Sequence, residues 1–134
     1  MGGDLSSVLL DTHVLHWWSA EPERVSRAAS EVIASADELV VADVSWFELA
    51  LLATRGRIAV SVPVLSWLER LSRMVRSAPV TPQIAATAAG LPQSFPGDPA
   101  DRLIYATAIE NGWKLVSKDE SLRSFGYPGL EVVW

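Results

Sequence analysis

Short apolar segments alternate along this chain with longer segments of helical periodicity, and no other feature limits its fold as strongly. The segments that read as strands are 7–10, 39–42, 114–117 and 131–133, and Val80 is expected in a further short strand. The segments that read as helices are 13–18, 26–35, 45–55, 63–76, 83–89, 101–110 and 120–123. Strands that alternate with helices in this way form parallel sheets with helices on both faces. The sequence therefore predicts an α/β fold with a central, mainly parallel, twisted sheet.

The composition is that of a single folded domain. Of the 134 residues, 49% are hydrophobic and 20% are charged, which leaves enough apolar surface to form a core. We expect one domain over residues 1–134, with residues 1–6 as a flexible lead. No apolar run approaches the roughly 18 residues that a membrane-spanning helix needs, so we expect a cytoplasmic protein with no membrane partner. The absence of Cys excludes disulfides, thiolate zinc sites and a thiol nucleophile.

The net charge of −5 and the pI of about 4.9 constrain the class of partner. A general nucleic-acid coat protein binds by neutralising phosphates with basic residues, so an acidic chain argues against that class. A nuclease is not excluded, because bound metal would offset several of the acids. The cations that could gather beside such a site are Arg55 and Arg57 at the end of one expected helix, and Arg70, Arg73 and Arg76 along another.

Four carboxylates stand where separate segments end a strand or begin a helix: Asp11, Glu48, Asp101 and Asp119. In an open α/β sheet those places share one edge, the crevice at the carboxyl ends of the strands. Carboxylates that crowd into one crevice repel each other, and an oxygen-binding divalent cation relieves that repulsion. The arrangement predicts a Mg²⁺- or Mn²⁺-dependent site that acts on phosphate esters.

Each acid also has a purely structural explanation. Asp11, Asp98 and Asp119 could cap the helices that follow them. Glu48 could pair with Ser45 in a capping box, and Asp101 in the first turn of its helix suits the helix dipole. A capping acid can lie at either end of a sheet, however, and here the strands would bring the acids to the same end. Asp98 is the acid most readily explained as a cap alone.

The remaining polar residues help to choose between metals. Oxygen ligands without Cys favour a hard cation over zinc. His13 and His16 are three residues apart, and we expect both to be structural rather than metal ligands. Thr12 and Ser117 carry hydroxyls next to the acids, where they could orient a ligand or simply cap a helix.

Four segments, in order and with compatible spacing, resemble the motifs of PIN domains and, within that family, of VapC-type toxin ribonucleases. They are Leu9–Trp18 with its Asp-Thr-His, Val44–Ala50 around Glu48, Asp98–Ala108, and Leu115–Asp119. The resemblance extends from about Ser7 to Trp134. The family often has Thr where Ser117 stands and Phe where Ala100 stands; the first change keeps the hydroxyl, and the second affects only local packing.

This resemblance implies a PIN-like three-layer α/β/α sandwich and a metal site formed by Asp11, Glu48, Asp101 and Asp119. It implies an endoribonuclease, a hydrolase that cleaves RNA phosphodiesters by means of a water activated by Mg²⁺, or by Mn²⁺ as a substitute. It further implies a homodimer and a cognate antitoxin protein, through which alone the chain would meet DNA. Arg102 or Lys118 could contact the substrate phosphate, and Thr12, Asp98 and Ser117 could support the site.

Three other classes are alternatives to the ribonuclease. A catalytically silent PIN-like module that binds protein would use its aromatic residues as a groove; Trp17, Trp18, Trp46 and Trp67 are many for a small domain. A phosphatase of the haloacid-dehalogenase type needs a second Asp two residues after the first, where this chain has His13. A P-loop nucleotide enzyme is excluded, because no Gly-x-x-x-x-Gly-Lys-[Ser/Thr] segment occurs.

Overall fold

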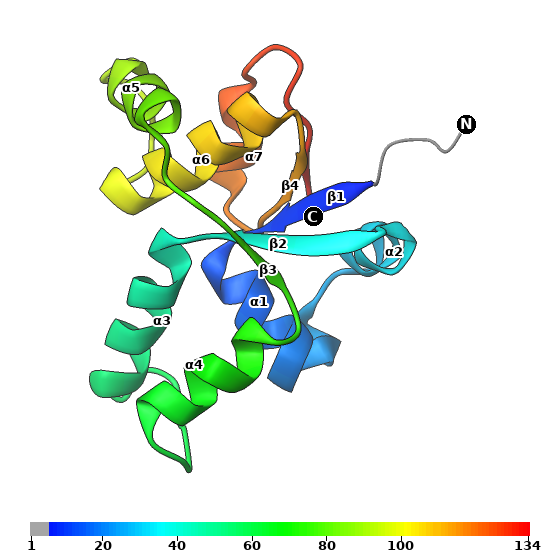
Figure 1. Ribbon diagram of the computed structural model, residues 1–134. Helices are drawn as coiled ribbons and strands as arrows, with labels where there is room; N and C mark the ends of the chain where they lie inside the picture. The colour runs from blue at the N-terminus through cyan, green and yellow to red at the C-terminus, as the bar shows by residue number, and fades with distance from the viewer. Residues whose placement is uncertain (1–5) are drawn as a thin grey trace.

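A computed structural model describes residues 6–134 and shows a five-stranded sheet between two layers of helices (Figure 1). The strands are β1 (Ser7–Leu10), β2 (Glu38–Ala42), β3 (Arg76–Ala78), β4 (Lys114–Val116) and β5 (Val132–Val133). The helices are α1 (Thr12–Ala20), α2 (Arg27–Ser35), α3 (Val44–Thr54), α4 (Val64–Ser72), α5 (Pro82–Gly90), α6 (Pro99–Asn111) and α7 (Glu120–Phe125), with a 3₁₀ turn η1 (Pro22–Arg24).

The sheet has the strand order β3-β2-β1-β4-β5, and every neighbouring pair is parallel. The central strand β1 pairs Leu9 with Val40 of β2 on one side and with Leu115 of β4 on the other. Parallel strands all end at the same edge, so β1, β2 and β4 deliver their following residues to one place. The predicted α/β class with a parallel sheet is confirmed.

The strands are buried on both faces, which explains why they appear in the sequence as continuous apolar runs. Val8 and Leu10 of β1 pack with α1, α2, α3 and α4 on one face. Leu9, between them, points to the other face and packs with α6 and α7. Helix α5 lies outside α6, where Ile84 and Ala88 pack against Ala106 (Figure 1). The chain thus forms the three-layer sandwich that the sequence predicted.

Helix caps follow ordinary local chemistry. The Ser26 side chain accepts a hydrogen bond from the Ala29 backbone at the start of α2, and Thr81 does the same for Ile84 at the start of α5. Helix α6 ends at Gly112, whose φ of +68° is a left-handed conformation that side chains other than Gly rarely adopt. These signals are local, and the predicted helix ends agree with them to within a few residues.

Two predictions about the middle of the chain are wrong. Helix α4 ends at Ser72 rather than near Arg76, and the third strand is Arg76–Ala78 rather than a strand that contains Val80. Val40 and Ala42 of β2 pair with Arg76 and Ala78, so tertiary pairing overrides helical periodicity there. Arg76 is consequently a strand residue and does not extend a row of arginines along α4.

The expected flexible lead, residues 1–6, lies outside the described residues except for Ser6. The Ser6 backbone N–H donates to the Asp37 side chain at 2.8 Å, which ties this residue to the loop before β2. Within residues 6–134, none of the helices has both the length and the apolar character needed to cross a membrane.

Candidate active site

Asp11 and Ser117 emerge side by side at the carboxyl edge of the sheet. The Asp11 backbone N–H donates to the Val116 carbonyl at 3.0 Å, and that of Ser117 donates to Val133 at 3.1 Å, so both residues extend the strand pairing. The buried Ser117 hydroxyl then donates to Asp11 Oδ2 at 2.7 Å. The two residues predicted from separate segments therefore form one unit.

Asp11 both caps a helix and faces the site. Its Oδ1 accepts from the Thr12 backbone at 2.8 Å at the start of α1. Burial raises the pKa of Asp11 above its usual value, against the opposing effects of the hydrogen bonds from Ser117 and Thr12. A carboxylate held in this way is accessible to a cation but costly to leave charged without one.

Glu48 is held by a chain of hydroxyls and not by a capping box. Helix α3 begins at Val44, and its preceding residue Asp43 makes no side-chain cap bond. Ser45 is fully buried, and its Oγ lies 2.9 Å from Thr12 Oγ1, which donates to Glu48 Oε1. The Ser45–Glu48 capping box considered from the sequence is therefore wrong, because Ser45 is directed at α1 instead.

Asp98 and Asp101 form the capping box at the start of α6. The Asp98 side chain accepts from the Asp101 backbone at 2.8 Å, and the Asp101 side chain accepts from the Asp98 backbone at 3.2 Å. This confirms Asp98 as a cap. The loop before it passes so close that a Cβ on Gly97 would lie 2.4 Å from the Asp101 Cβ, so only Gly fits there.

Asp119 caps α7, where its Oδ1 accepts from the backbone of Ser121 at 2.9 Å. The Asp119 backbone in turn donates to Ser117 Oγ at 3.1 Å, which places it next to the residue that binds Asp11. Asp119 is exposed, whereas Asp11, Glu48 and Asp101 are half-buried. It therefore stands at the rim of the site.

All four predicted carboxylates line one cavity of about 550 Å³, which we call the carboxylate cavity. Its lining residues are Asp11, Thr12, His13, Val14, Trp17, Glu48, Asp98, Asp101, Lys118 and Asp119. They come from α1, α3, α6 and the turn after β4, so segments far apart in sequence converge as the parallel sheet requires.

Of the two cations predicted to meet substrate, Lys118 lines the carboxylate cavity and Arg102 does not. The Lys118 Nζ lies 5.5 Å from the centre of the Trp17 ring, within the range of a cation–π contact. The Arg102 guanidinium donates to the carbonyls of Ala88, Leu91 and Pro92, so it binds the chain itself.

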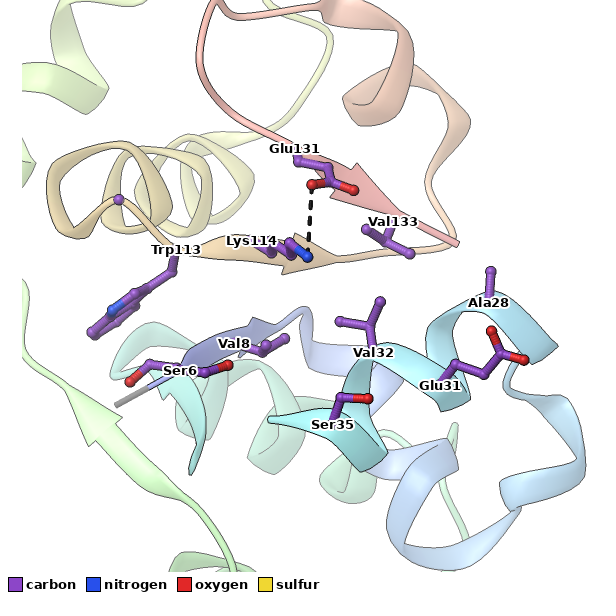
Figure 2. A pocket seen from close by; sticks show the side chains of 12 residues that line it. Ser6, Val8, Ala28, Glu31, Val32, Ser35, Trp113, Lys114, Glu131 and Val133 are labelled. Atoms are coloured by element: carbon purple, nitrogen blue, oxygen red, sulfur yellow. Dashed lines mark ion pairs between the residues drawn. The ribbon is translucent and has the colours of Figure 1, made fainter. Parts of the chain in front are cut away.

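A cavity of about 610 Å³ lies elsewhere, around the amino ends of β1 and β4 (Figure 2). Its acids are Glu31 and Glu131, and Glu131 pairs with Lys114 at 3.8 Å. Val8, Val32 and Val133 supply much of the remaining wall (Figure 2). This cavity is larger, yet it lacks a set of unneutralised carboxylates, and the chemistry therefore points to the carboxylate cavity.

Crowding of the acids raises their affinity for protons. Burial, followed by the charges of Asp98 and Asp11, raises the pKa of Asp101 to about 7. Burial also raises the pKa of Glu48, with the Asp11 charge adding to it and the Thr12 hydrogen bond opposing it. Near neutral pH Asp101 is therefore protonated in part of the molecules.

The carboxylate oxygens are the type of ligand that suits a hard divalent cation, although the side chains do not converge on one point as a complete set of ligands. Within residues 6–134, no three acidic or histidine side chains are arranged so that they could hold one metal ion. The Asp101 carboxylate is instead bonded to the Asp98 backbone. Carboxylate oxygens are the donors that Mg²⁺ and Mn²⁺ prefer, and Mg²⁺ retains several waters in place of protein ligands.

Three residues that shape the site were not identified from the sequence as doing so. Ser45 fitted a local capping pattern that concealed its long-range contact, and Gly97 stood in a loop already rich in Pro and Gly. Trp17 lines the cavity, although the sequence favoured the core for it. The one signal that could have indicated Gly97 is its position immediately before a candidate functional acid, Asp98.

Comparison with known proteins agrees with this geometry. The PIN domain family matches residues 8–126. Ribonuclease VapC22 of Mycobacterium tuberculosis (strain ATCC 25618 / H37Rv) is 62% identical over 130 residues, which are 97% of this chain and 100% of that protein.

Solved structures show the same fold at low sequence identity. VapBC-1 from nontypeable Haemophilus influenzae superposes with a TM-score of 0.70 at 16% identity, covering 94% of this chain and 96% of that chain. VapC20 of Mycobacterium tuberculosis, a Sarcin-Ricin loop cleaving toxin, superposes with a TM-score of 0.63 at 19% identity, covering 92% and 98%. With 119 residues matched by the family and a close relative over its full length, the chain belongs to the PIN-domain family, in its VapC group.

Proposed function

We propose that this protein is a Mg²⁺- or Mn²⁺-dependent endoribonuclease that acts as the toxin of a toxin–antitoxin pair. The observation that carries the proposal is the convergence of Asp11, Glu48, Asp101 and Asp119 on one cavity. The 62% identity to a ribonuclease over nearly the whole chain supports RNA as the substrate. RNA is a cytoplasmic substrate, which agrees with the compartment expected from the sequence.

In the proposed mechanism Asp11, Glu48 and Asp101 would hold the principal cation, and Asp119 would assist from the rim. A bound divalent cation would supply a lowered pKa for the attacking water and would neutralise charge that develops on the phosphate. Ser117 fixes Asp11 by its 2.7 Å hydrogen bond, and Thr12 fixes Glu48. Lys118 lines the cavity wall, and in the proposed mechanism it would contact a phosphate oxygen.

The experiment that tests this function is cleavage of a pool of cellular RNAs by the purified protein with Mg²⁺, with Mn²⁺ and with EDTA. Discrete products that require metal and vanish in Asp11→Asn are the expected result. Asn retains the shape and one acceptor oxygen of Asp, so loss of cleavage would report the lost charge. Full metal-dependent cleavage by Asp11→Asn would overturn the site assignment.

The alternative, a silent module that binds protein, has one observation in its favour: no three acidic or histidine side chains of residues 6–134 are arranged to hold an ion. Titration with Mn²⁺ separates the two functions. A folded protein that binds no Mn²⁺ at millimolar concentration and cleaves no RNA would be such a module.

The proposed protein partners are a cognate antitoxin and a second copy of the chain. Phe47 on α3 and Leu65 on α4 are 64% and 68% exposed, and they offer apolar surface that a partner would cover. Solved neighbours such as VapBC2 from Rickettsia felis, at 13% identity and a TM-score of 0.69, are toxin–antitoxin complexes. Light scattering after size-exclusion chromatography measures the expected dimer directly.

A further inference from the structure

The carboxylate cavity continues into a second cavity, of about 270 Å³, along α3. Both are lined by Thr12, His13, Glu48 and Asp98, so they adjoin across these residues. Beyond them the second cavity is lined by Leu51, Leu52, Arg55 and Arg57. Together the two cavities make one groove with the carboxylates in the middle.

Cations line both parts of this groove. Lys118 lines only the carboxylate cavity, and Arg55 and Arg57 line only the second cavity, so the residues that the two cavities share lie between them. The proposed ribonuclease must bring a polyanion to a protein of net charge −5, so cations beside the acids are needed to offset repulsion. The groove places them where phosphates on either side of the reacting one would lie.

The other cations of the protein do not compete for this role. Ion pairs engage Arg24, Arg27, Arg76 and Lys114, and Arg102 donates to main-chain carbonyls. Within residues 6–134, the cations with neither an acidic partner nor a hydrogen bond to a main-chain carbonyl are Arg55, Arg57, Arg70, Arg73, Lys118 and Arg123. Three of these six, Arg55, Arg57 and Lys118, line the groove.

The arginine end of the groove is fixed by its backbone. At the end of α3 the Arg55 N–H donates to Leu51 at 2.9 Å, and the Arg57 N–H donates to Leu52 at 2.8 Å. Gly56, with φ of +72°, makes the tight turn between them. Ile58, immediately after, is buried in the core. The two guanidinium groups thus project from an anchored turn, which lowers the entropy lost when they bind a ligand.

His13 stands where the two cavities adjoin, and it is exposed. Its ring lies 5.7 Å from that of Trp17, tilted by 43°. His13, the exposed member of this pair, offers a base a stacking surface next to the carboxylates, as aromatic side chains do in proteins that bind single strands.

We propose that Arg55 and Arg57 form a binding subsite for the RNA backbone on one side of the scissile phosphate, with Lys118 on the other side. The substrate is then a single-stranded segment that lies along the groove, and recognition extends beyond the two nucleotides at the cleaved bond. This subsite rests on the proposed ribonuclease function, but it can be tested without cleavage.

The test is binding of a fluorescein-labelled single-stranded oligoribonucleotide, in EDTA, followed by fluorescence polarisation. Wild type is compared with Arg55→Gln/Arg57→Gln and with the control Arg70→Gln/Arg73→Gln, which removes the same charge from α4. We expect the Kd to rise about tenfold in the first variant. The slope of log Kd against log salt concentration should fall by about one to two. The control should keep the wild-type Kd to within about twofold.

Equal RNA affinity in the two double variants overturns the subsite, as does a wild type that fails to bind the RNA. If the first variant keeps its RNA affinity but no longer associates with a coexpressed antitoxin, the end of the groove binds protein and the proposal is likewise overturned. Circular dichroism confirms that each variant is folded. Cleavage is scored separately: a wild type that cleaves no RNA and binds no Mn²⁺ would refute the ribonuclease, whereas weakened RNA binding in the first variant would still show that Arg55 and Arg57 bind RNA.

Discussion

Ser45 illustrates how a single buried hydroxyl can set the position of a carboxylate that it does not touch. Thr12 has one hydroxyl proton and donates it to Glu48, so Ser45 must be the donor in the 2.9 Å bond between Ser45 and Thr12. Successive hydroxyl bonds of this kind polarise one another. Ser45 therefore fixes the direction in which Thr12 donates, and through it the orientation of Glu48.

We expect Ser45→Ala to weaken Mn²⁺ binding and to lower kcat by about tenfold, as loss of a group that orients a metal ligand usually does. The KM for RNA should change little, because Ser45 is buried away from substrate. Calorimetric Mn²⁺ titration and cleavage kinetics measure the two effects.

A double-mutant cycle with Thr12→Val distinguishes this role from simple packing. If Ser45 acts through Thr12, adding Ser45→Ala to Thr12→Val should cost almost nothing more in Mn²⁺ affinity. Fully additive losses would contradict the hydroxyl chain. Ser66→Ala, at an exposed position of α4, is the matched control.

Asp101 gives a prediction for stability against pH. Burial raises its pKa to about 7 in the folded protein, whereas in the unfolded chain the carboxyl has its ordinary pKa of 3.8. Between these values the folded state binds a proton that the unfolded state has lost, so without metal this contribution falls as pH rises from about 4 to about 7.

Asp101→Asn removes the titrating carboxyl, so stability should no longer fall with rising pH through this residue. In EDTA the free energy of unfolding of the variant should equal that of wild type at pH 4. At pH 8 it should exceed that of wild type by about 1 to 2 kcal/mol, a value reduced for the partial exposure of Asp101. Urea unfolding at the two pH values measures the difference. Asp43→Asn, which removes an exposed carboxylate outside both cavities, should not show it, and a variant less stable than wild type at pH 8 would contradict the prediction.

Part of the site could be predicted because the order of strands and helices, and not a local contact, determines where those residues lie. Asp11 and Asp119 follow strands of one parallel sheet, so their shared edge followed from the order of elements alone. Ser45 and Gly97 could not be found in this way, since each acts through a contact with a residue from another turn or element that leaves no local periodic signal.

At the scale of elements, the loop that leads into α6 is held by Arg102. Its guanidinium donates to Ala88 O and Leu91 O at 3.1 and 3.0 Å, and it lies 5.6 Å from the centre of the Phe95 ring. These contacts join the end of α5 and the loop to α6, which carries Asp101. The role of Arg102 is therefore to hold this segment in place.

Arg102→Gln should lower the free energy of unfolding by about 1 to 3 kcal/mol, the usual cost of leaving buried carbonyls without a charged donor. Its affinity for RNA in EDTA should remain near that of wild type, because the side chain lines neither cavity. Urea unfolding and fluorescence polarisation measure the two quantities. Arg123→Gln is the control for stability, and a large loss of RNA affinity in a folded Arg102→Gln would contradict this role.

The segment from α4 to β3 shows where periodicity misleads at this scale. Arg73 and Met74 close a tight turn by bonds to Arg70 and Leu71, and the chain then enters the sheet. Arg76 binds Glu38 of β2 at 2.8 Å and lies over Trp113. Partners so distant in sequence decide the helix end, and a single sequence shows none of them.

At the scale of the whole molecule, the proposed metal site means that protons and the metal would compete for one cavity, and we expect the stability of the entire domain to depend on both. A cation present at ten times its Kd adds about 1.4 kcal/mol, or roughly 4 °C in Tm for a domain of this size. We expect Mg²⁺ to raise Tm by that order at pH 8 and by less at pH 5, where Asp101 is protonated.

Thermal unfolding by circular dichroism at the two pH values measures the shift. Asp11→Asn should abolish it at both. A shift of equal size at pH 5 and pH 8, or one retained in Asp11→Asn, would show that Mg²⁺ acts somewhere other than the carboxylate cavity.

Because several acids at the carboxylate cavity also cap helices, this protein can lose charge there by mutation without losing its fold. Asp11, Asp98 and Asp119 each begin a helix with an oxygen that Asn also possesses. One base change converts an Asp codon to Asn, which would remove the charge while the helix keeps its cap. If the protein is the proposed toxin, a single mutation of this kind would yield a folded and harmless variant, and that variant would still bind the proposed antitoxin.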